Sequence, residues 1–135
     1  MPLDHLNPDA LFASPAFTQV VTASGSRTIY VSGQVAWDKD DGLVGEGDFA
    51  AQAKKAYENL AAALDAAGAT PDDVAKTTVY IVDYSASDPS MRHALDDARS
   101  AIFNGPNPPA STLIGVQALA FRGLMIEVEA IAVLD

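Results

Sequence analysis

The stretch that most constrains the fold is Leu124 to Leu134, which reads LMIEVEAIAVL. Side chains of a β-strand alternate between its two faces. The even-numbered residues would therefore form a wholly apolar face, whereas the odd-numbered face would carry Glu127 and Glu129. Two carboxylates about 7 Å apart on so apolar a strand need a partner, a wet cavity or a chemical role. We therefore expect one face in the core and the other in a functional site.

Turn residues divide the rest of the chain into short strands and two helices. The segments 17–23 and 28–37 are rich in apolar and β-branched residues, and Ser24-Gly25-Ser26 between them predicts a hairpin. In chain order, the predicted elements are strands at 17–23 and 28–37, a helix between Asp48 and Gly68, a strand at 76–82, a helix between Asp88 and Asn104, a strand at 111–120, a hairpin turn at 121–123 and the last strand at 124–134.

This order, β-β-α-β-α-β-β, predicts one α+β domain that spans residues 1–135, with a single sheet and two helices on one of its faces. The other face would carry Met125, Ile131 and Val133 beside the two carboxylates. Because soluble monomers rarely leave a large apolar patch in water, we expect copies of the chain to associate through this face. A site there would lie at a subunit boundary.

The composition excludes several kinds of site and partner. There are 18 Asp and Glu against 8 Lys and Arg, and the net charge of −10 disfavours nucleic acid as a partner. The absence of cysteine excludes disulfides, thiolate zinc sites and a cysteine nucleophile. No apolar run reaches the roughly 18 residues of a membrane span. The N-terminal MPLDHLNPDALF has no basic region followed by an apolar core, so we expect a cytoplasmic protein.

Several motifs, in order and at matching spacings, resemble one protein family, the reactive intermediate deaminases, also called Rid or YjgF. The resemblance runs from about Pro15 to Val133. It implies a chorismate-mutase-like homotrimer with three clefts between subunits, where small enamines or imines are hydrolysed to a keto acid and ammonia without a metal or organic cofactor. The motifs are YVSGQV at 30–35, Gln52 and Asn59-Leu60 in the first helix, AAG at 66–68, VAKTTVY at 74–80 and IEVEAIA at 126–132.

The resemblance implies that Glu127 positions the attacking water and that Ser32 and Gly33 line the cleft. Imine hydrolysis needs little more than a base near an electrophilic carbon, so one glutamate on a rigid strand suffices. The Ser32 hydroxyl, the Gly33 amide or the Thr112 hydroxyl would add hydrogen bonds to it. Glu129, on the same face of the strand as Glu127, is expected to contact the ligand as well.

Three positions depart from the pattern of the best-known family members. Their tyrosine near the N-terminus falls on Phe17, and the arginine that clamps the substrate carboxylate falls on Ser111. A cysteine common two residues later falls on Leu113, and a polar residue of the second helix falls near Asp96. Phe17, Asp96, Ser111 and Leu113 are therefore expected in the ligand-binding cleft, which resembles that of a branch without the arginine. Arg122, in the predicted hairpin turn, is too far along the chain to replace the clamp within one subunit.

The loss of the arginine changes the expected substrate. Losing a bidentate arginine–carboxylate pair weakens a carboxylate ligand by roughly two orders of magnitude. Glu127 and Glu129 would also repel an anion in the same cleft. We therefore expect a neutral or cationic substrate rather than a 2-imino acid. The apolar side chains of Phe17 and Leu113 would raise the pKa of a lone carboxylate toward that of a base useful near neutral pH.

Other readings of the same residues stay open at this point. The two glutamates could pair with Lys or Arg across a subunit boundary. A glycosidase would need its carboxylates to flank a bond, and a metal site would need better ligand spacing than His5 or His93 offers. The chain could also be a non-catalytic small-ligand-binding or chaperone-like trimer with the same cleft. Endoribonuclease activity, sometimes attached to this family, conflicts with the charge of −10.

Overall fold

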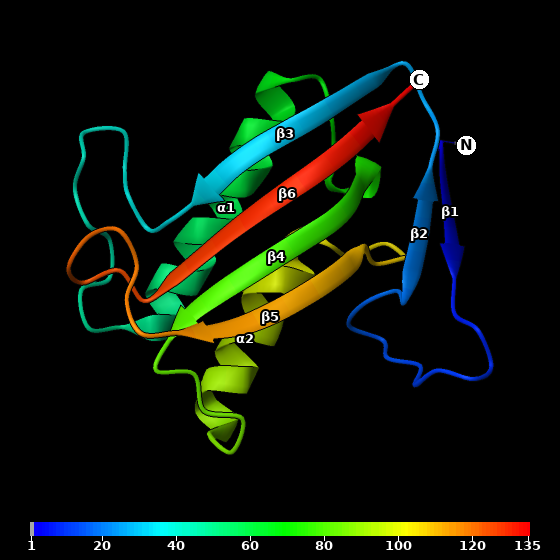
Figure 1. Ribbon diagram of the computed structural model, residues 1–135. Helices are drawn as coiled ribbons and strands as arrows, with labels where there is room; N and C mark the ends of the chain where they lie inside the picture. The colour runs from blue at the N-terminus through cyan, green and yellow to red at the C-terminus, as the bar shows by residue number, and fades with distance from the viewer. Residues whose placement is uncertain (1) are drawn as a thin grey trace.

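The computed structural model describes residues 2–135, which form six strands, two α-helices and one short 3₁₀ helix (Figure 1). In chain order these are β1 (Leu3–Leu6), β2 (Val20–Ala23), β3 (Arg27–Gln34), α1 (Phe49–Ala66), η1 (Pro71–Asp73), β4 (Val74–Val82), α2 (Pro89–Ile102), β5 (Ala110–Val116) and β6 (Ile126–Leu134).

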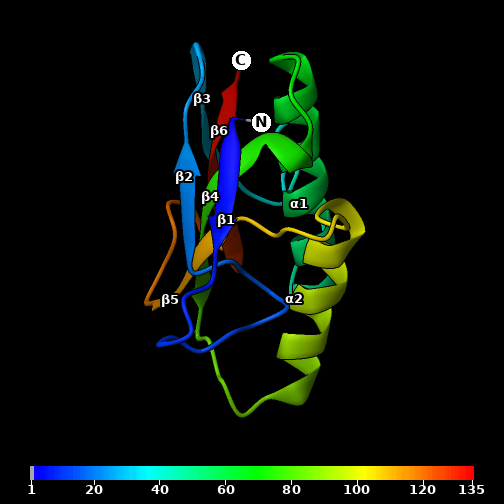
Figure 2. The same ribbon diagram turned by 90° about the vertical axis from the view of Figure 1, so that its right-hand side faces the viewer.

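Four of the strands form one sheet in the order β3-β6-β4-β5, and β1 pairs with β2 in a separate two-stranded sheet. β6 runs antiparallel to both of its neighbours, whereas β5 runs parallel to β4. α1 and α2 pack together on one face of the larger sheet (Figure 2). The predicted α+β class, with two helices on one face, is therefore confirmed. We call the opposite face of this sheet the open face.

α1 forms where capping residues flank an apolar stripe. The side chain of Asp48 accepts a hydrogen bond from the amide of Ala51 at 3.1 Å, and Gly68 takes the positive φ of 79° that a helix end favours. Leu60 and Leu64 on the buried side of the helix belong to the core that β6 completes. The helix agrees with the one predicted between these capping residues. In residues 2–135, no helix combines the length and the apolarity of a membrane span.

β6 shows the predicted alternation of side chains. Ile126, Val128 and Ala132 are fully buried toward the helices. Glu127 and Glu129 are half-buried and point to the open face, because they alternate with these core residues. The strand therefore seals the core with one set of side chains and presents the carboxylates with the other.

The predicted hairpin between the segments 17–23 and 28–37 is wrong. β2 pairs with β1, and β3 pairs with β6 instead. A Cβ atom on Gly25 would lie 2.3 Å from the carbonyl oxygen of Leu134, so the chain passes closely over the end of β6 and leaves the plane of the sheet there. The N-terminal residues supply an additional strand, β1, that is absent from the predicted elements and is the partner of β2.

The hairpin of β1 and β2 covers one end of the open face. Leu3 and Val21 pack against Ala75 and Val133. Val133, predicted to be covered only by self-association, is thus buried within the chain. Ile131, two residues earlier on the same face, is still 38% exposed. Within the chain, only the part of the open face beyond the hairpin stays uncovered.

The predicted turn at 121–123 does not join two neighbouring strands. β4 lies between β5 and β6, so the segment after β5 must cross to the far side of β4. The reason is that α2 carries the chain from β4 to β5 as a parallel crossover, which places β5 at the edge of the sheet. The last predicted strand is also two residues shorter, because β6 begins at Ile126.

Gln52 of α1 fixes the segment that leads into β6. Its side chain is fully buried, and its Nε2 donates to the carbonyl oxygens of Gly45 at 3.2 Å and Gly123 at 2.8 Å. Its Oε1 accepts from the amide of Met125 at 2.9 Å. One amide side chain thus satisfies three backbone groups from two loops, directly before the strand that carries Glu127.

We expect Gln52→Met to lower the free energy of unfolding by about 2–4 kcal/mol, because the change keeps the side-chain length but leaves buried backbone groups without partners. Urea denaturation followed by circular dichroism measures this. Gln117→Met, in an exposed loop, is the control and should change stability by less than about 0.5 kcal/mol. Equal losses in the two variants would contradict the anchoring role of Gln52.

Candidate active site on the open face

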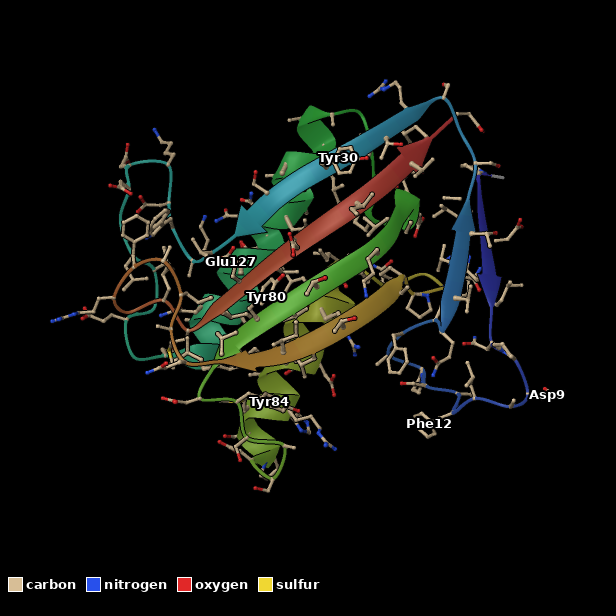
Figure 3. The ribbon with its side chains drawn as sticks, in the orientation of Figure 1. Asp9, Phe12, Tyr30, Tyr80, Tyr84 and Glu127 are labelled. Atoms are coloured by element: carbon tan, nitrogen blue, oxygen red, sulfur yellow. The ribbon has the colours of Figure 1, made fainter. Side chains whose placement is uncertain are left out.

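Glu127 lies near the start of β6, between β3 and β4, and is half-buried. Its register partner on β4 is Tyr80, and the two side chains project from neighbouring strands on the open face (Figure 3). Because both neighbouring strands are hydrogen-bonded to β6, the backbone under the carboxylate is rigid. A carboxylate held in this way can act as a base on a water molecule that reaches the open face.

A bulge in β3 makes room for the Glu127 carboxylate. Val31 pairs with Ala130 and Gln34 pairs with Val128, so β3 has one residue more than β6 between these pairs. A Cβ atom on Gly33 would lie 1.8 Å from Oε2 of Glu127. Any side chain at this position would displace the carboxylate, which occupies the niche that the glycine leaves.

Glu129 is bonded to Tyr80, a residue that is not among the predicted site residues. The hydroxyl of Tyr80 donates to Oε1 of Glu129 at 2.5 Å, a short hydrogen bond of the kind formed with a carboxylate. Thr78, one alternation earlier on β4, is the register partner of Glu129. The alternation of Lys76, Thr78 and Tyr80 in the predicted strand was visible in the sequence, but the register that places them beside the two glutamates was not.

The two carboxylates have no cation between them. Burial raises the pKa of Glu127, and the negative charge of Glu129 raises it further. The hydrogen bond to Glu129 raises the pKa of the Tyr80 phenol. Among residues 2–135, the ion pairs are Lys54–Glu58 on α1 and Arg99–Asp96 on α2, so neither glutamate of the site is neutralised by its own chain.

Lys76 is the basic residue of β4 on the open face, and it lines the same small cavity as Glu129. Its Nζ donates to Oγ1 of Thr112 on β5 at 2.6 Å. Thr112 pairs with Thr78, which pairs with Glu129, so Thr112 lies two strands away from the glutamates, about 10 Å. Its hydroxyl belongs to the open face but is engaged by the lysine.

The other predicted ligand-binding residues lie on the opposite side of the sheet. Ser111 accepts a hydrogen bond at 3.0 Å from the hydroxyl of Thr77, whose side chain is buried toward the helices. Leu113, two residues along β5, alternates to the same side and is 40% exposed at the sheet edge. Within one chain, neither residue faces Glu127.

Phe17 and Asp96 lie near this same edge. The loop that carries Phe17 reaches from the β1–β2 hairpin to α2 (Figure 2). Arg99 of α2 ties it there, since its Nη1 donates to the carbonyl oxygen of Ala16 at 3.0 Å while its Nη2 donates to Asp96 at 3.0 Å. On the other side of Phe17, the amide of Thr18 donates to the carbonyl oxygen of Pro109, just before β5, at 3.1 Å.

The nine predicted site residues therefore form two groups. One group, which we call the open-face group, lies on β3, β5 and β6. The other, which we call the edge group, lies on α2, β5 and the loop before β2. One chain does not bring the two groups together. The open-face group comprises Ser32, Gly33, Thr112, Glu127 and Glu129, and the edge group comprises Phe17, Asp96, Ser111 and Leu113.

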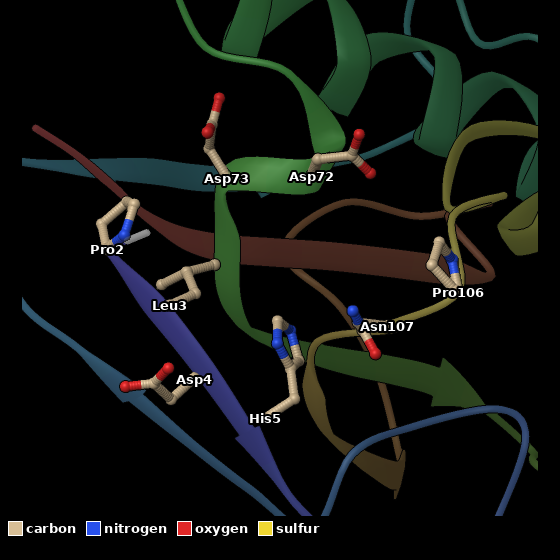
Figure 4. Close-up of a pocket in the computed structure, with 8 residues that line it drawn as sticks. All are labelled: Pro2, Leu3, Asp4, His5, Asp72, Asp73, Pro106 and Asn107. Carbon is tan, nitrogen blue, oxygen red and sulfur yellow. The ribbon is translucent and has the colours of Figure 1, made fainter.

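Two cavities are lined by residues of the open-face group: one of about 570 Å³ has Gly33, Trp37 and Asn59 in its wall, and a smaller one lies beside Glu129. The smaller one, of about 230 Å³, lies on the open face and is lined by Lys76, Thr78, Glu129, Ala130 and Ile131. A third cavity, of about 510 Å³, lies where β1 meets η1 and is lined by His5, Asp72 and Asp73 but by none of the nine predicted site residues (Figure 4). In the part of the chain that the structure describes, no group of His, Asp or Glu side chains is arranged to hold a metal ion.

Gly33→Ala tests the niche. The new methyl group would collide with the end of a flexible side chain, so we expect Glu127 to swing out while the free energy of unfolding changes by less than about 1 kcal/mol. Exposure to water should lower the pKa of Glu127 toward its usual range, as measured by ¹³C NMR titration of labelled glutamate. Gly115→Ala, on the same sheet but away from the carboxylates, should leave that pKa unchanged.

The chain is similar to proteins of one family along most of its length. Residues 8–134 match the family model described as Endoribonuclease L-PSP. A rat protein named 2-iminobutanoate/2-iminopropanoate deaminase is 39% identical over 118 residues, 87% of this chain and 80% of the rat protein. A RutC family protein of Pyrococcus abyssi is 36% identical over 104 residues, 77% of this chain and 76% of that protein.

Solved structures show the same likeness. The crystal structure of YyfB from Yersinia pestis, described as a protein of unknown function of the conserved Rid protein family, superposes with a TM-score of 0.91 at 38% identity. The match covers 99% of this chain and 100% of that one. The family model, the relatives and the fold coincide over nearly the whole chain, and we conclude that the chain belongs to the Rid/YjgF family.

Proposed function

We propose that the chain hydrolyses a small imine or enamine with release of ammonia, on a substrate less anionic than a 2-imino acid. The observation that carries this proposal is the half-buried, unneutralised Glu127 in the niche at Gly33. Relatives named 2-iminobutanoate/2-iminopropanoate deaminase, from rat, mouse and human at 36–39% identity, support the reaction class.

Glu127 is the base in this reaction. It removes a proton from water as the water oxygen bonds to the imine carbon, and the electron pair of the C=N bond moves to nitrogen. The same carboxyl group then returns the proton to nitrogen, which gives a protonated carbinolamine when the imine enters as its iminium form. As the C–N bond breaks, Glu127 accepts the proton of the new hydroxyl group, so that ammonia leaves and a carbonyl group forms. Burial and the charge of Glu129 suit Glu127 to both steps, because a raised pKa makes it the stronger base when ionised and keeps proton return favourable.

The complete cleft requires a second copy of the chain in this proposal. The edge group lies on the far side of the sheet from Glu127 within one chain, so only a neighbouring subunit can bring it over the open face. The open face exposes apolar surface that an interface would cover, including Tyr30, which is 78% exposed, and Ile131. A homotrimer with three inter-subunit clefts satisfies both requirements.

The charge of the cleft argues for a neutral or cationic substrate. Ser111, at the position of the family's clamping arginine, provides only a neutral hydroxyl, which is already bonded to Thr77. Glu127 and Glu129 would repel a carboxylate that approached the open face. The same charges, with the net charge of −10, disfavour the cleavage of RNA that the name of the family model suggests.

A second candidate is a non-catalytic trimer that binds small ligands, or acts like a chaperone, through the same cleft. The observation that favours it is the absence of the family's arginine and phenol at Ser111 and Phe17. The assay that separates the two generates an unstable imine with an amino-acid oxidase, traps the remainder with semicarbazide and compares decay with and without the protein. Decay that is unchanged for neutral, cationic and anionic amino acids would favour the binding protein.

Replacing Glu127 with Gln should slow catalysed decay of the imine by at least about 100-fold, because the base is lost. In the wild type, the rate should fall as the pH drops through the raised pKa of Glu127, above the usual range of a glutamate, since only the ionised form accepts a proton. Glu58→Gln, an exposed glutamate on α1, is the matched control. A Glu127→Gln variant as fast as the wild type would contradict the role of this residue.

Ser111→Arg should restore activity toward 2-imino acids if the missing cation alone prevents their binding. We expect kcat/KM for imines of leucine or alanine to rise by about tenfold or more, mainly through KM, because the charge-assisted bond adds binding energy. The rate with a neutral imine should stay within about twofold and serves as the internal reference. An unchanged KM for 2-imino acids would show that the loss of the arginine does not set the specificity.

A further inference from the structure

We propose that Tyr80 is a positioning residue of this site: its hydroxyl holds the Glu129 carboxylate in one orientation, in which that carboxylate binds the nitrogen of a cationic imine. The inference rests on the proposed function and makes it more specific. The substrate class is a small iminium ion, with N–H groups and a positive charge beside the carbon that water attacks.

The geometry of three side chains carries this inference. Tyr80 is the register partner of Glu127, and its hydroxyl reaches along β6 to donate to Glu129 at 2.5 Å. Tyr80 thus lies beside Glu127 on the neighbouring strand of the open face, as Figure 3 shows, while its hydroxyl is bonded to Glu129. A rigid aromatic ring on a central strand can fix the orientation of a glutamate, which otherwise has three rotatable side-chain bonds.

A phenol orients Glu129 without neutralising it. An arginine or lysine in the same place would cancel the negative charge, whereas a neutral donor leaves it available to a cation. The single proton of the Tyr80 hydroxyl is used on Glu129, so the phenol oxygen offers only lone pairs to a ligand. The surface around Glu127, Glu129 and Tyr80 is therefore rich in hydrogen-bond acceptors, which suits a ligand that carries N–H donors.

The charged groups that face this cluster come from few elements. β6 contributes Glu127 and Glu129, and β4 contributes Tyr80 and Lys76, whose ammonium group is directed to Thr112 on β5. β5 has no ionisable side chain, and β3 contributes Tyr30, opposite Ile131, at the far end from Glu127. Two carboxylates without a bonded cation make this surface attractive to a positively charged ligand.

Space for the rest of such a ligand lies beside Glu129. The cavity of about 230 Å³ there has Thr78 and Ile131 in its wall as well as Glu129 and Lys76. A ligand whose nitrogen contacts Glu129 would thus extend into this cavity and present its imine carbon toward Glu127.

Two measurements test the role of Tyr80. The first is independent of catalysis and uses acetamidinium chloride, an unreactive planar cation with N–H donors, titrated into ¹³C-glutamate-labelled protein. We expect wild-type protein to bind it with a shift of the Glu129 signal, and Tyr80→Phe to bind it at least fivefold more weakly. Tyr84→Phe, which removes a hydroxyl beyond the end of β4, should leave the affinity within twofold. Equal affinities in Tyr80→Phe and wild type would overturn the proposal.

The second measurement separates binding from chemistry. With an imine that carries a positive charge, Tyr80→Phe should raise KM at least fivefold and leave kcat within about twofold, because Glu127 is untouched. With a neutral enamine, both constants should stay near those of the wild type. A fall in kcat with KM unchanged would contradict a positioning role. A wild-type protein that binds acetamidinium at Glu129, with the loss of affinity expected in Tyr80→Phe, but hydrolyses no imine would refute the proposed hydrolysis and leave this inference intact.

Discussion

Glu127 and Glu129 take their direction from β6, which is hydrogen-bonded along its length to β3 on one side and β4 on the other. The alternation of this strand buries Ile126 and Val128 against the helices and thereby turns Glu127 and Glu129 to the open face. A shift of register by one residue would put the two carboxylates in the core. The free energy of burying two unpaired charges would exceed the stability of a domain of this size. Burial of the apolar side is thus what holds the carboxylates in place.

Three local features further fix the positions of the two carboxylates. The bulge in β3 brings Gly33 beside Glu127, and the missing side chain leaves the space that the carboxylate fills. Gln52 anchors the segment before the strand through three backbone groups. Tyr80 reaches Glu129 from β4. The result is a pair of carboxylates in fixed positions, partly shielded from water and without a cation of their own, which is an arrangement that favours a positively charged ligand.

The separation of the site residues into two groups has a physical consequence. Ser111 and Leu113 alternate with Thr112 on β5, so they must face away from the open face that Thr112 shares with Glu129. No side-chain rotation can bring them to Glu127 through the sheet. A cleft that included both groups would have to lie between two copies of the chain, and its specificity would depend on assembly as much as on the fold of one subunit.

The sequence by itself determined the elements whose patterns are local. The alternation in β6, the Asp48 and Gly68 boundaries of α1, and the α+β class all follow from periodicity and capping, which act over a few residues. Glu127 could be selected for the same reason, because a carboxylate on an apolar strand is anomalous wherever that strand lies.

Only the tertiary structure decided which strands are neighbours. The pairing of β2 with β1, the position of β4 between β5 and β6, and the contact of Tyr80 with Glu129 are all long-range. The segments before and after Ser24–Ser26 were predicted to pair because they are adjacent in sequence, but the close passage of Gly25 over the end of β6 separates them. Strand register and sheet order depend on how whole faces pack, and a single sequence read element by element does not contain that information.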